Sequence, residues 1–483
     1  MLRIILVVVS AALGTLSITA DAQQAQGAMG GGMGMGMGGS RLGGYTEPPP
    51  AGRVPAHTLD IVLGRPTDDS ITASVLAYAD MEGYLAFGTH GGEYTGKTEA
   101  VALANGQPVD ILVDDLAANT RYFYELRYRS TGETEFQNTD EYSFHTQRAG
   151  NSPFTFTVQS DSHMDENTDG AVYANTLSNA LADSPDFHIA MGDTFMTDKY
   201  IDFKNSEAAY LAQRYYFGLL SHSAPLFFAL GNHDGERRNQ NPDMVLWSAN
   251  TRKKYLPNPF PSDFYTGNEQ EEPGIGLVAD YYSWEWGSSL FVVLDPFRYE
   301  KPRSEENWWV SLGAEQYEWL EQTLAESNST FKFVFIHHLV GGVESNRGGA
   351  EASEFFEWGG KNFDERYSFD RERPGWAMPI HDLMVKNDVS IVFHGHDHMY
   401  IQQERDGIVY QLVQQPGHPR GGINSAEPYG YLSGTAVAGS GHLRVAVSTD
   451  RVDVDYVRSA LAERENAPGP NREILHSYAV DAK

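Results

Sequence analysis

The sequence predicts two folded parts, an all-β sandwich followed by a larger α/β part. The chain has 483 residues, and at about 100–200 residues per domain this length suggests two or three domains. Between residues 57 and 147, short strand-like runs alternate with turn-forming residues, without helical periodicity, as in β-sandwiches. From Pro153 onward, apolar strand-like runs alternate with helical stretches, which is typical of an α/β fold.

The first 22 residues have the layout of a secretory signal peptide. Arg3 precedes an apolar run that ends near Leu16, and Ala20-Asp21-Ala22 supplies a small-residue cleavage site. The apolar run is shorter than the ~20 residues that a spanning helix needs. We therefore expect a secreted or periplasmic protein without a membrane span in its mature form, the alternative being an uncleaved N-terminal anchor.

Residues 23–53 are rich in Gly, Met and Pro and carry no core-forming pattern, which predicts a disordered linker. The sandwich is expected over residues 54–148. Its strand-like runs lie at 58–64, 70–78, 84–88, 107–113, 120–129 and 141–146. Residues 116–124 resemble the corner of fibronectin type III modules, in which a buried Tyr bonds back to the backbone.

The α/β part is expected over residues 152–460, followed by a C-terminal tail at 461–483. Strand-like runs lie at 154–158, 188–191, 226–230, 290–294, 331–336 and 389–393. Helical stretches lie near 171–182, 206–220, 313–325 and 379–385, and β-like alternation returns at 408–414, 442–448 and 452–457.

Composition narrows the function. The chain has 65 acidic and 35 basic side chains, a formal charge of −30, which argues against binding a nucleic acid duplex. Cysteine is absent from the sequence, which excludes disulfides, thiolate metal ligands and a cysteine nucleophile.

Five of the apolar strands are followed at once by side chains that can bind metals. These are Asp161 and His163, Asp193, Asn232 to Asp234, His337 and His338, and His394 to His398. In open α/β sheets, sites form in the crevice beyond the carboxyl ends of the strands. We therefore expect these side chains to meet in one site.

The donor types indicate the kind of metal. His nitrogens with Asp and Asn oxygens suit Fe, Mn or Zn better than Ca²⁺ or Cu(I). The ligands are too many for one tetrahedral ion, and they suit two ions that share a carboxylate about 3.5–4 Å apart.

The ordered series Asp161-x-His163, Gly192-Asp193, Gly231 to Asp234, His337 and Gly395-His396-x-His398 is similar to the calcineurin-like metallophosphoesterase family. With the fibronectin III-like sandwich and residues 395–400, it resembles the purple acid phosphatase branch. The resemblance implies a four-layer α/β/β/α sandwich with two divalent or trivalent metal ions. It also implies hydrolysis of phosphomonoesters or phosphodiesters by direct attack of a metal-bound hydroxide.

The resemblance also implies a role for each matching residue. The first ion would be held by Asp161, His163 and His398, the second by Asn232, His337 and His396, and both by Asp193. His233 would contact a substrate oxygen or protonate the leaving group, and Asp234 would orient His233. Because neighbours on a strand point to opposite sides, His338 is the alternative to His337.

Two positions depart from purple acid phosphatases. That branch has a Tyr three residues after the bridging Asp, where this chain has Met196, and it lacks a His ligand where this chain has His163. We therefore expect a protein that is not purple, whose first site favours Fe²⁺, Mn²⁺ or Zn²⁺ over Fe³⁺.

Residues 339–376 form a long insertion that starts at the rim of the predicted site. Loops of this length are usually functional or disordered, and we expect a lid in which Arg347 binds substrate phosphate. An insertion that only covers the edge of the fold is the alternative.

The sequence thus predicts an exported phosphoesterase that acts on a small phosphorylated substrate. An exported protein that binds a polymer or a partner and has an idle site is a second hypothesis. A metal-dependent hydrolase of non-phosphate esters or sulfates is a third.

Overall fold

The computed structural model describes residues 44–47, 49, 54–298, 307–462 and 468–483. The predicted signal peptide and nearly all of the predicted linker lie outside these residues. None of the helices within the described residues is long and apolar enough to cross a membrane.

The N-terminal part is a sandwich of two antiparallel sheets. One contains β1 (Leu59–Gly64), β2 (Ile71–Ala77) and β6 (Pro108–Val113). The other is built on β3 (Met81–Gly88) and β7 (Arg121–Ser130), with β4 (Gly96–Lys97), β5 (Val101–Leu103), β8 (Gln137–Asn138) and β9 (Tyr142–His145). Alternating apolar side chains such as Val75 and Leu126 fill the space between the sheets.

The corner predicted from the fibronectin-like segment is present. The backbone N–H of Ala117 donates a 2.8 Å hydrogen bond to the hydroxyl of the buried Tyr122. This bond satisfies a backbone group that the turn leaves unpaired. It confirms the interpretation of residues 116–124.

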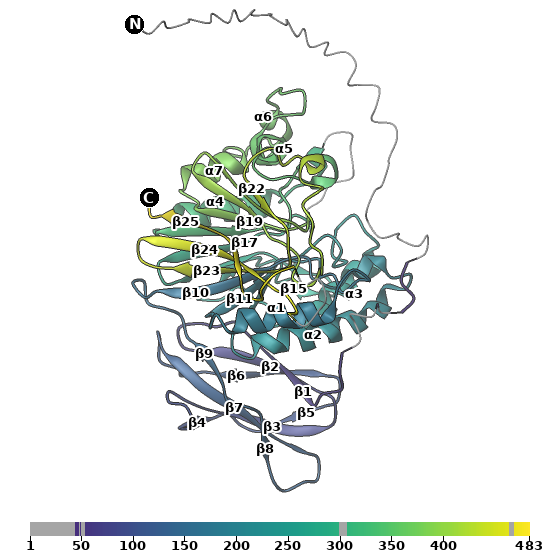
Figure 1. Ribbon diagram of the computed structural model, residues 1–483, viewed down its shortest axis with the longest axis vertical. Coiled ribbons are helices and arrows are strands. Elements are labelled where there is room, and N and C mark those ends of the chain that lie inside the picture. Colours follow the sequence, from purple (N-terminus) through teal and green to yellow (C-terminus); the bar gives the residue numbers. More distant parts are fainter. Residues whose placement is uncertain (1–43, 48, 50–53, 299–306, 463–467) are drawn as a thin grey trace, which may run out of the picture. The chain divides into compact units, whose positions relative to one another are not determined.

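Two large mixed sheets form the second part of the chain (Figure 1). The six-stranded sheet has the order β12 (Leu226–Phe228), β11 (Phe187–Ala190), β10 (Phe154–Gln159), β23 (Gly441–Val447), β24 (Arg451–Arg458), β25 (Ile474–Asp481). The eight-stranded sheet has the order β13 (Thr266–Gly267), β16 (Tyr282–Trp286), β17 (Ser289–Val293), β18 (Phe331–Phe335), β19 (Ile391–His394), β21 (Ile408–Leu412), β20 (Tyr400–Arg405), β22 (Thr435–Val437). A short hairpin, β14 (Glu271–Glu272) and β15 (Gly276–Leu277), stands apart from both.

The two sheets face each other across an aromatic core and carry helices on their outer faces. Phe156 and Phe187 of one sheet pack against Phe291 of the other. Helices α1 (Gly170–Leu181) and α2 (Glu207–Ser221) belong to the six-stranded side, and α4 (Ala314–Glu326) and α7 (Ile380–Lys386) to the eight-stranded side (Figure 1). The predicted four-layer α/β/β/α arrangement is therefore confirmed.

The remaining helices lie in the connections. They are η2 (Thr197–Lys199), η3 (Phe203–Ser206), α3 (Pro242–Tyr255), η4 (Asn307–Trp309), η5 (Glu344–Asn346), η6 (Ala352–Glu354), α5 (Phe356–Gly359), α6 (Phe369–Glu372) and η7 (Glu427–Tyr429). Helix α3 was not predicted. Its start is marked by Asn241, which caps the Asp243 N–H, and by Pro242 in the first turn.

The C-terminal strand β25 corrects the prediction of a tail at residues 461–483. It pairs antiparallel to β24, with Val480 opposite Val452 and Tyr478 opposite Val454. Its side chains alternate between exposed and partly buried positions, as expected where one face of an edge strand packs on the core. The weak alternation of residues 474–481 hid this strand in the sequence.

The insertion at residues 339–376 is folded, and its first half belongs to the core. Leu339, Val340, Ala352 and Trp358 are buried in the cluster under the eight-stranded sheet. The Trp358 indole donates a 3.0 Å hydrogen bond to the Tyr410 hydroxyl of β21. This part of the insertion is therefore a fixed piece of the fold.

The sandwich and the α/β part are joined by hydrogen bonds to buried backbone groups. The Tyr124 hydroxyl donates to the His222 carbonyl at 2.6 Å. The fully buried guanidinium of Arg214, on α2, donates to the carbonyls of Ser74 in β2, at 2.8 Å, and of Tyr255, at 2.9 Å. Gly44–Lys483 accordingly forms one compact unit.

Replacing Arg214 by leucine should destabilise the whole protein. The substitution keeps an apolar stem but removes the guanidinium that donates to the buried Ser74 and Tyr255 carbonyls, at a cost of about 3 kcal/mol in the free energy of unfolding. Urea unfolding measures the effect, with Arg371→Leu on the surface as the matched control. An unchanged midpoint would show that apolar packing alone holds the sandwich in place.

Candidate metal centre

The polar side chains predicted to meet do lie together at the carboxyl ends of the strands. Asp161 and His163 follow β10, Asp193 follows β11, and Asn232 follows β12. His337 follows β18, and His396 and His398 follow β19. Their donor atoms form two groups, each compact enough to hold one metal ion: Asp161, His163, Asp193 and His398, and Asp193, His337 and His396. Asp193 is common to both.

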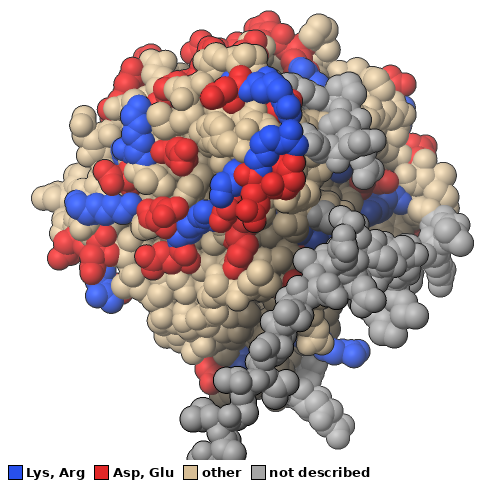
Figure 2. Space-filling view, turned by 90° about the horizontal axis from the view of Figure 1, so that it is seen from above, with Lys and Arg blue, Asp and Glu red and all other residues tan. Residues whose placement is uncertain are grey.

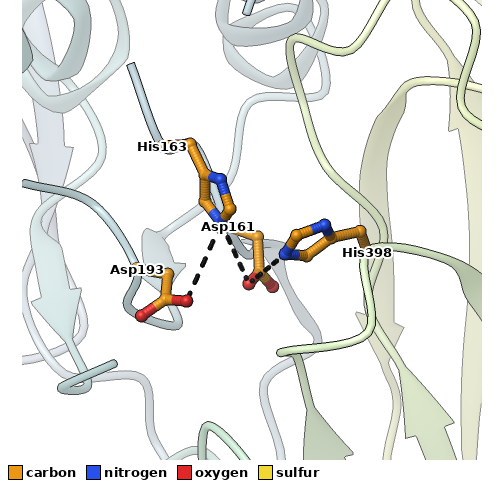
Figure 3. A group of neighbouring side chains, drawn as sticks. All are labelled: Asp161, His163, Asp193 and His398. Carbon is orange, nitrogen blue, oxygen red and sulfur yellow. Dashed lines mark ion pairs between the residues drawn. The ribbon is translucent and has the colours of Figure 1, made fainter. Parts of the chain in front are cut away.

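The first group converges on a small space (Figure 3). His163 Nε2 lies 3.6 Å from Asp161 Oδ1 and 3.7 Å from Asp193 Oδ2, and His398 Nε2 lies 3.4 Å from Asp161 Oδ1. Both Asp161 Oδ1 and His163 Nε2 are buried and have no hydrogen-bond partner. Buried polar atoms rarely remain unpartnered, so this donor set fits a bound cation.

The second group is built in the same way and shares Asp193 with the first. His337 Nε2 lies 3.4 Å from Asp193 Oδ2 and 3.2 Å from Asn232 Oδ1. His396 Nδ1 is buried without a hydrogen-bond partner. The second group therefore also presents nitrogen and oxygen donors that a borderline cation would satisfy.

The imidazole rings of His163 and His337 are each oriented by a hydrogen bond at Nδ1, on the side away from the carboxylates of Asp161 and Asp193. His163 Nδ1 lies 3.1 Å from Asp165 Oδ2, and His337 Nδ1 lies 2.7 Å from the Met191 carbonyl. In metalloproteins such bonds set the tautomer and the orientation of ligating histidines. Here they leave the Nε2 atoms of His163 and His337 facing the carboxylates.

The backbone of the site is unusual. Asp161, His163, Asp193, His396 and His398 all have φ between 50° and 72°. Non-glycine residues rarely adopt this left-handed conformation, which costs about 1–3 kcal/mol each and clusters at functional sites. Loop-to-loop hydrogen bonds enforce it, among them His163 N–H to the Asp193 carbonyl at 2.9 Å and His396 N–H to Asp161 Oδ2 at 2.9 Å.

Gly231 allows the loops of Asp193 and Asn232 to approach each other. A Cβ atom at this position would collide with the backbone nitrogen and the carboxylate of Asp193. We expect Gly231→Ala to displace Asp193, to lower the free energy of unfolding by about 1–3 kcal/mol, and to reduce the metal content. Gly422→Ala, where no atom lies within 4 Å of the added methyl, is the control for urea unfolding and metal analysis.

The charges of the site are balanced by histidines. Burial opposes ionisation of Asp161 and Asp193, but His337 and other nearby imidazoles hold the pKa of each carboxyl well below its usual range. Burial would likewise lower the pKa of His163 and His337, but the surrounding carboxylates raise these pKa values to about 10 and about 9. The carboxylates thus require positive charge close by, from protonated rings or from bound cations.

His233 lies beside the two groups, and its ring is oriented by Asp198. Its Nδ1 is 2.9 Å and 3.0 Å from the two oxygens of Asp198, while its backbone N–H donates to Asp193 Oδ1 at 2.7 Å. The ring centroids of His233 and His163 are 6.3 Å apart. A histidine held in this way can transfer a proton at its other ring nitrogen.

The prediction that Asp234 orients His233 is therefore wrong. Asp234 is fully buried, and its carboxylate accepts the backbone N–H groups of Gly231, Asp193, Thr194 and Phe195 at 2.8–3.1 Å. Burial and the nearby Asp193 raise the pKa of Asp234 to about 7. The tight turn points the Asp234 side chain back into these loops, so its carboxylate holds the backbone around Asp193 in place. The residue that orients His233 is Asp198, which the sequence analysis did not identify.

Two further residues were singled out in the sequence. His338 lies outside both groups, with its Nδ1 3.0 Å from the Leu339 carbonyl, so the choice of His337 agrees with the geometry. Arg347 donates to Asp397 Oδ1 at 2.5 Å and lies 3.9 Å over the Tyr429 ring. Its predicted contact with phosphate stays a prediction.

Comparisons with known proteins agree with this geometry. Residues 154–400 match the family described as calcineurin-like phosphoesterase, and no curated protein sequence matches the chain significantly. The solved structure of PhoD is similar over 91% of this chain and 91% of its own, with 12% identity and a TM-score of 0.62. A purple acid phosphatase, PPD1 from yellow lupin (Lupinus luteus) seeds, is similar over 88% of this chain and 74% of its own, with 16% identity and a TM-score of 0.59. Both similarities include the N-terminal β region, and the matched segment carries every residue of the two donor groups, so this chain belongs to the calcineurin-like phosphoesterase family.

Proposed function

We propose that this protein is an exported phosphoesterase that uses two metal ions to hydrolyse small phosphomonoesters or phosphodiesters. The observation that carries the proposal is Asp193, a buried carboxylate shared by two groups of metal-binding side chains. A bridging carboxylate between two cations is the arrangement used for in-line displacement at phosphorus.

The donor atoms suggest how the ions would be divided. Asp161, His163 and His398 would hold the first ion, Asn232, His337 and His396 the second, and Asp193 both. When bound, such ions polarise the phosphoryl oxygens and lower the pKa of a water molecule. Nitrogen-rich donor sets of this kind suit Fe, Mn or Zn. Purple acid phosphatases carry a colour-giving Tyr at the position of Met196, so we expect this protein not to be purple.

His233 is the proton donor of the proposal. It would contact a substrate oxygen or protonate the leaving alkoxide, a contribution of about 10²–10⁴-fold in rate. Asp198 would hold the ring through Nδ1 and so fix its orientation and tautomer. The buried loops around Asp193 would limit access of bulk water, which strengthens these electrostatic contacts.

The charge of the chain bears on the substrate. Acidic and basic side chains interleave on the face shown in Figure 2, while the whole chain carries a net charge of −30. An anionic substrate must therefore be attracted by a local field at the site, which two bound cations would supply.

Export rests on the sequence alone. The layout of residues 1–22 supports cleavage after Ala22. Mass spectrometry of protein recovered from the cells and from the medium tests this part, since the mature chain would begin at Gln23.

Hydrolysis assays with chromogenic esters test the activity. Metal-stripped protein is reloaded with Mn²⁺, Fe²⁺ or Zn²⁺ and assayed with p-nitrophenyl phosphate, bis-p-nitrophenyl phosphate and p-nitrophenyl sulfate. We expect turnover of a phosphate ester that requires metal, and the ratio of the first two rates gives the mono- or diester preference. Two bound ions without turnover of any ester would favour an idle site in a binding protein, and turnover of sulfate alone would favour the third hypothesis.

A further inference from the structure

Asp397 lies between the candidate ligands His396 and His398 and is held by residues from outside their loop. Its side chain is buried, and its Oδ1 accepts from Arg347 Nη1 at 2.5 Å. Its Oδ2 accepts from the Gly348 N–H at 3.1 Å and from the Tyr431 hydroxyl at 2.7 Å. Arg347 and Gly348 belong to the insertion at 339–376, so the insertion is bonded to the loop that carries two candidate ligands.

The same insertion also contacts His396 itself. His396 Nε2 lies 2.9 Å from the Ser345 carbonyl, which can only accept a hydrogen bond. Nε2 therefore carries the proton, and Nδ1 is left with a free lone pair. Nδ1 is the atom that is buried without a partner, and His396 belongs to the donor group of Asp193 and His337. The insertion thus selects the tautomer that can bind a cation.

Arg347 is fixed on two sides. Its guanidinium bonds to Asp397 and lies flat over the Tyr429 ring at 3.9 Å. A planar guanidinium can pair with a carboxylate and stack on an aromatic ring at the same time, which a lysine ammonium cannot do. A buried carboxylate such as Asp397 needs such a partner, because an unpaired charge there would be costly.

We propose that Asp397, Arg347 and Tyr431 form a clamp that positions His396 as a ligand of the second metal ion. This inference rests on the proposed function in assuming that a second ion is bound. The three residues are positioning residues, because they act on the ion through His396. Because the insertion that carries Arg347 also contacts His396 directly, through the Ser345 carbonyl, loss of the clamp should weaken the second site more than the first.

Metal titration of the full-length mature protein tests the clamp. Metal-stripped wild type, Arg347→Ala, Arg347→Lys, Tyr431→Phe and the surface control Arg371→Ala are titrated with Zn²⁺ against a competing chelator, without substrate. We expect Arg347→Ala to bind the second ion 10–100-fold more weakly, as for other outer partners of ligating histidines, with a smaller change in first-ion affinity. Arg347→Lys should recover part of the loss, Tyr431→Phe should lose less, and Arg371→Ala should match wild type.

Kinetics separates the clamp from a direct contact with phosphate. If the clamp exists, the lower kcat of Arg347→Ala should recover in excess Zn²⁺ and KM should stay within twofold of wild type. Wild-type affinity for both ions with a more than tenfold higher KM would instead make Arg347 a phosphate ligand and overturn the clamp. Equal weakening of both ions with a lower unfolding midpoint would also overturn it, in favour of a general structural role.

The clamp and the proposed function can fail separately. Selective loss of the second ion in Arg347→Ala would support the clamp even if wild type hydrolyses none of the esters. Binding of only one ion by wild type would overturn the clamp, whatever esters the protein hydrolyses.

Discussion

Replacing Asp193 by asparagine is expected to lower kcat for phosphate ester hydrolysis by about 10³-fold or more, since two cations together supply several kcal/mol to the transition state. Asparagine keeps the shape and the oxygen that accepts the His233 N–H, but it removes the charge on which both donor groups depend. Metal analysis of the purified variant should find at most one ion per chain, against two in wild type.

The control for this variant is Asp450→Asn, which removes an exposed carboxylate and should change neither metal content nor rate. Circular dichroism establishes that Asp193→Asn is folded. Two retained ions with a rate within threefold of wild type would contradict the assignment of Asp193 as the shared ligand.

His233→Asn should lower kcat by about 10²–10⁴-fold, the range for loss of a proton donor, and leave both ions in place. The loss should be larger for an alkyl phosphate such as glycerol phosphate than for p-nitrophenyl phosphate. Nitrophenolate is a weak base and leaves without being protonated, whereas an alkoxide is a strong base and must be protonated as it leaves. Parallel kinetics on the two esters, with metal analysis of the same sample, measures this difference.

Asp198→Asn is the companion variant. It keeps a hydrogen-bonding side chain near His233 Nδ1 but removes the carboxylate that pairs with the ring and orients it. Its kcat should fall by a smaller factor than that of His233→Asn, with the same dependence on the leaving group. An equal loss on both esters would argue that His233 contacts the substrate without donating a proton.

The metal ligands could be predicted from sequence because a simple rule places them. Residues that follow neighbouring parallel strands meet at one edge of a sheet, so Asp161 and Asp193 had to converge once their strands were recognised. His337 follows a strand of the other sheet and reaches the same site because the two sheets pack together, with its Nδ1 2.7 Å from the Met191 carbonyl. The strands were recognisable because their buried runs, such as 331–336, are almost wholly apolar and bounded by polar residues.

The partners of those ligands could not be predicted in this way. Asp234 is the neighbour of His233 in sequence, yet the turn directs it to backbone N–H groups, and Asp198 reaches the ring from 35 residues away. Arg347 and Asp397, which are hydrogen-bonded, lie 50 positions apart in the sequence. Such pairs depend on how loops fold over one another, for which periodicity and composition carry no information.

Arg214 and Tyr124 donate hydrogen bonds to backbone carbonyls of the other part of the chain. These bonds limit how the two parts can be separated or recombined by protein engineering. Removal of residues before 152 would expose the Arg214 guanidinium and the face of α2 that the sandwich buries. The α/β part would then carry a charged group without the carbonyl of Ser74 that it bonds to. We therefore expect the α/β part to lose stability when the sandwich is removed or replaced by one that lacks these hydrogen-bonding groups. Mutations in β2 that touch no ligand can still alter the yield of active enzyme, and libraries meant to change the catalytic loops should carry the sandwich with them.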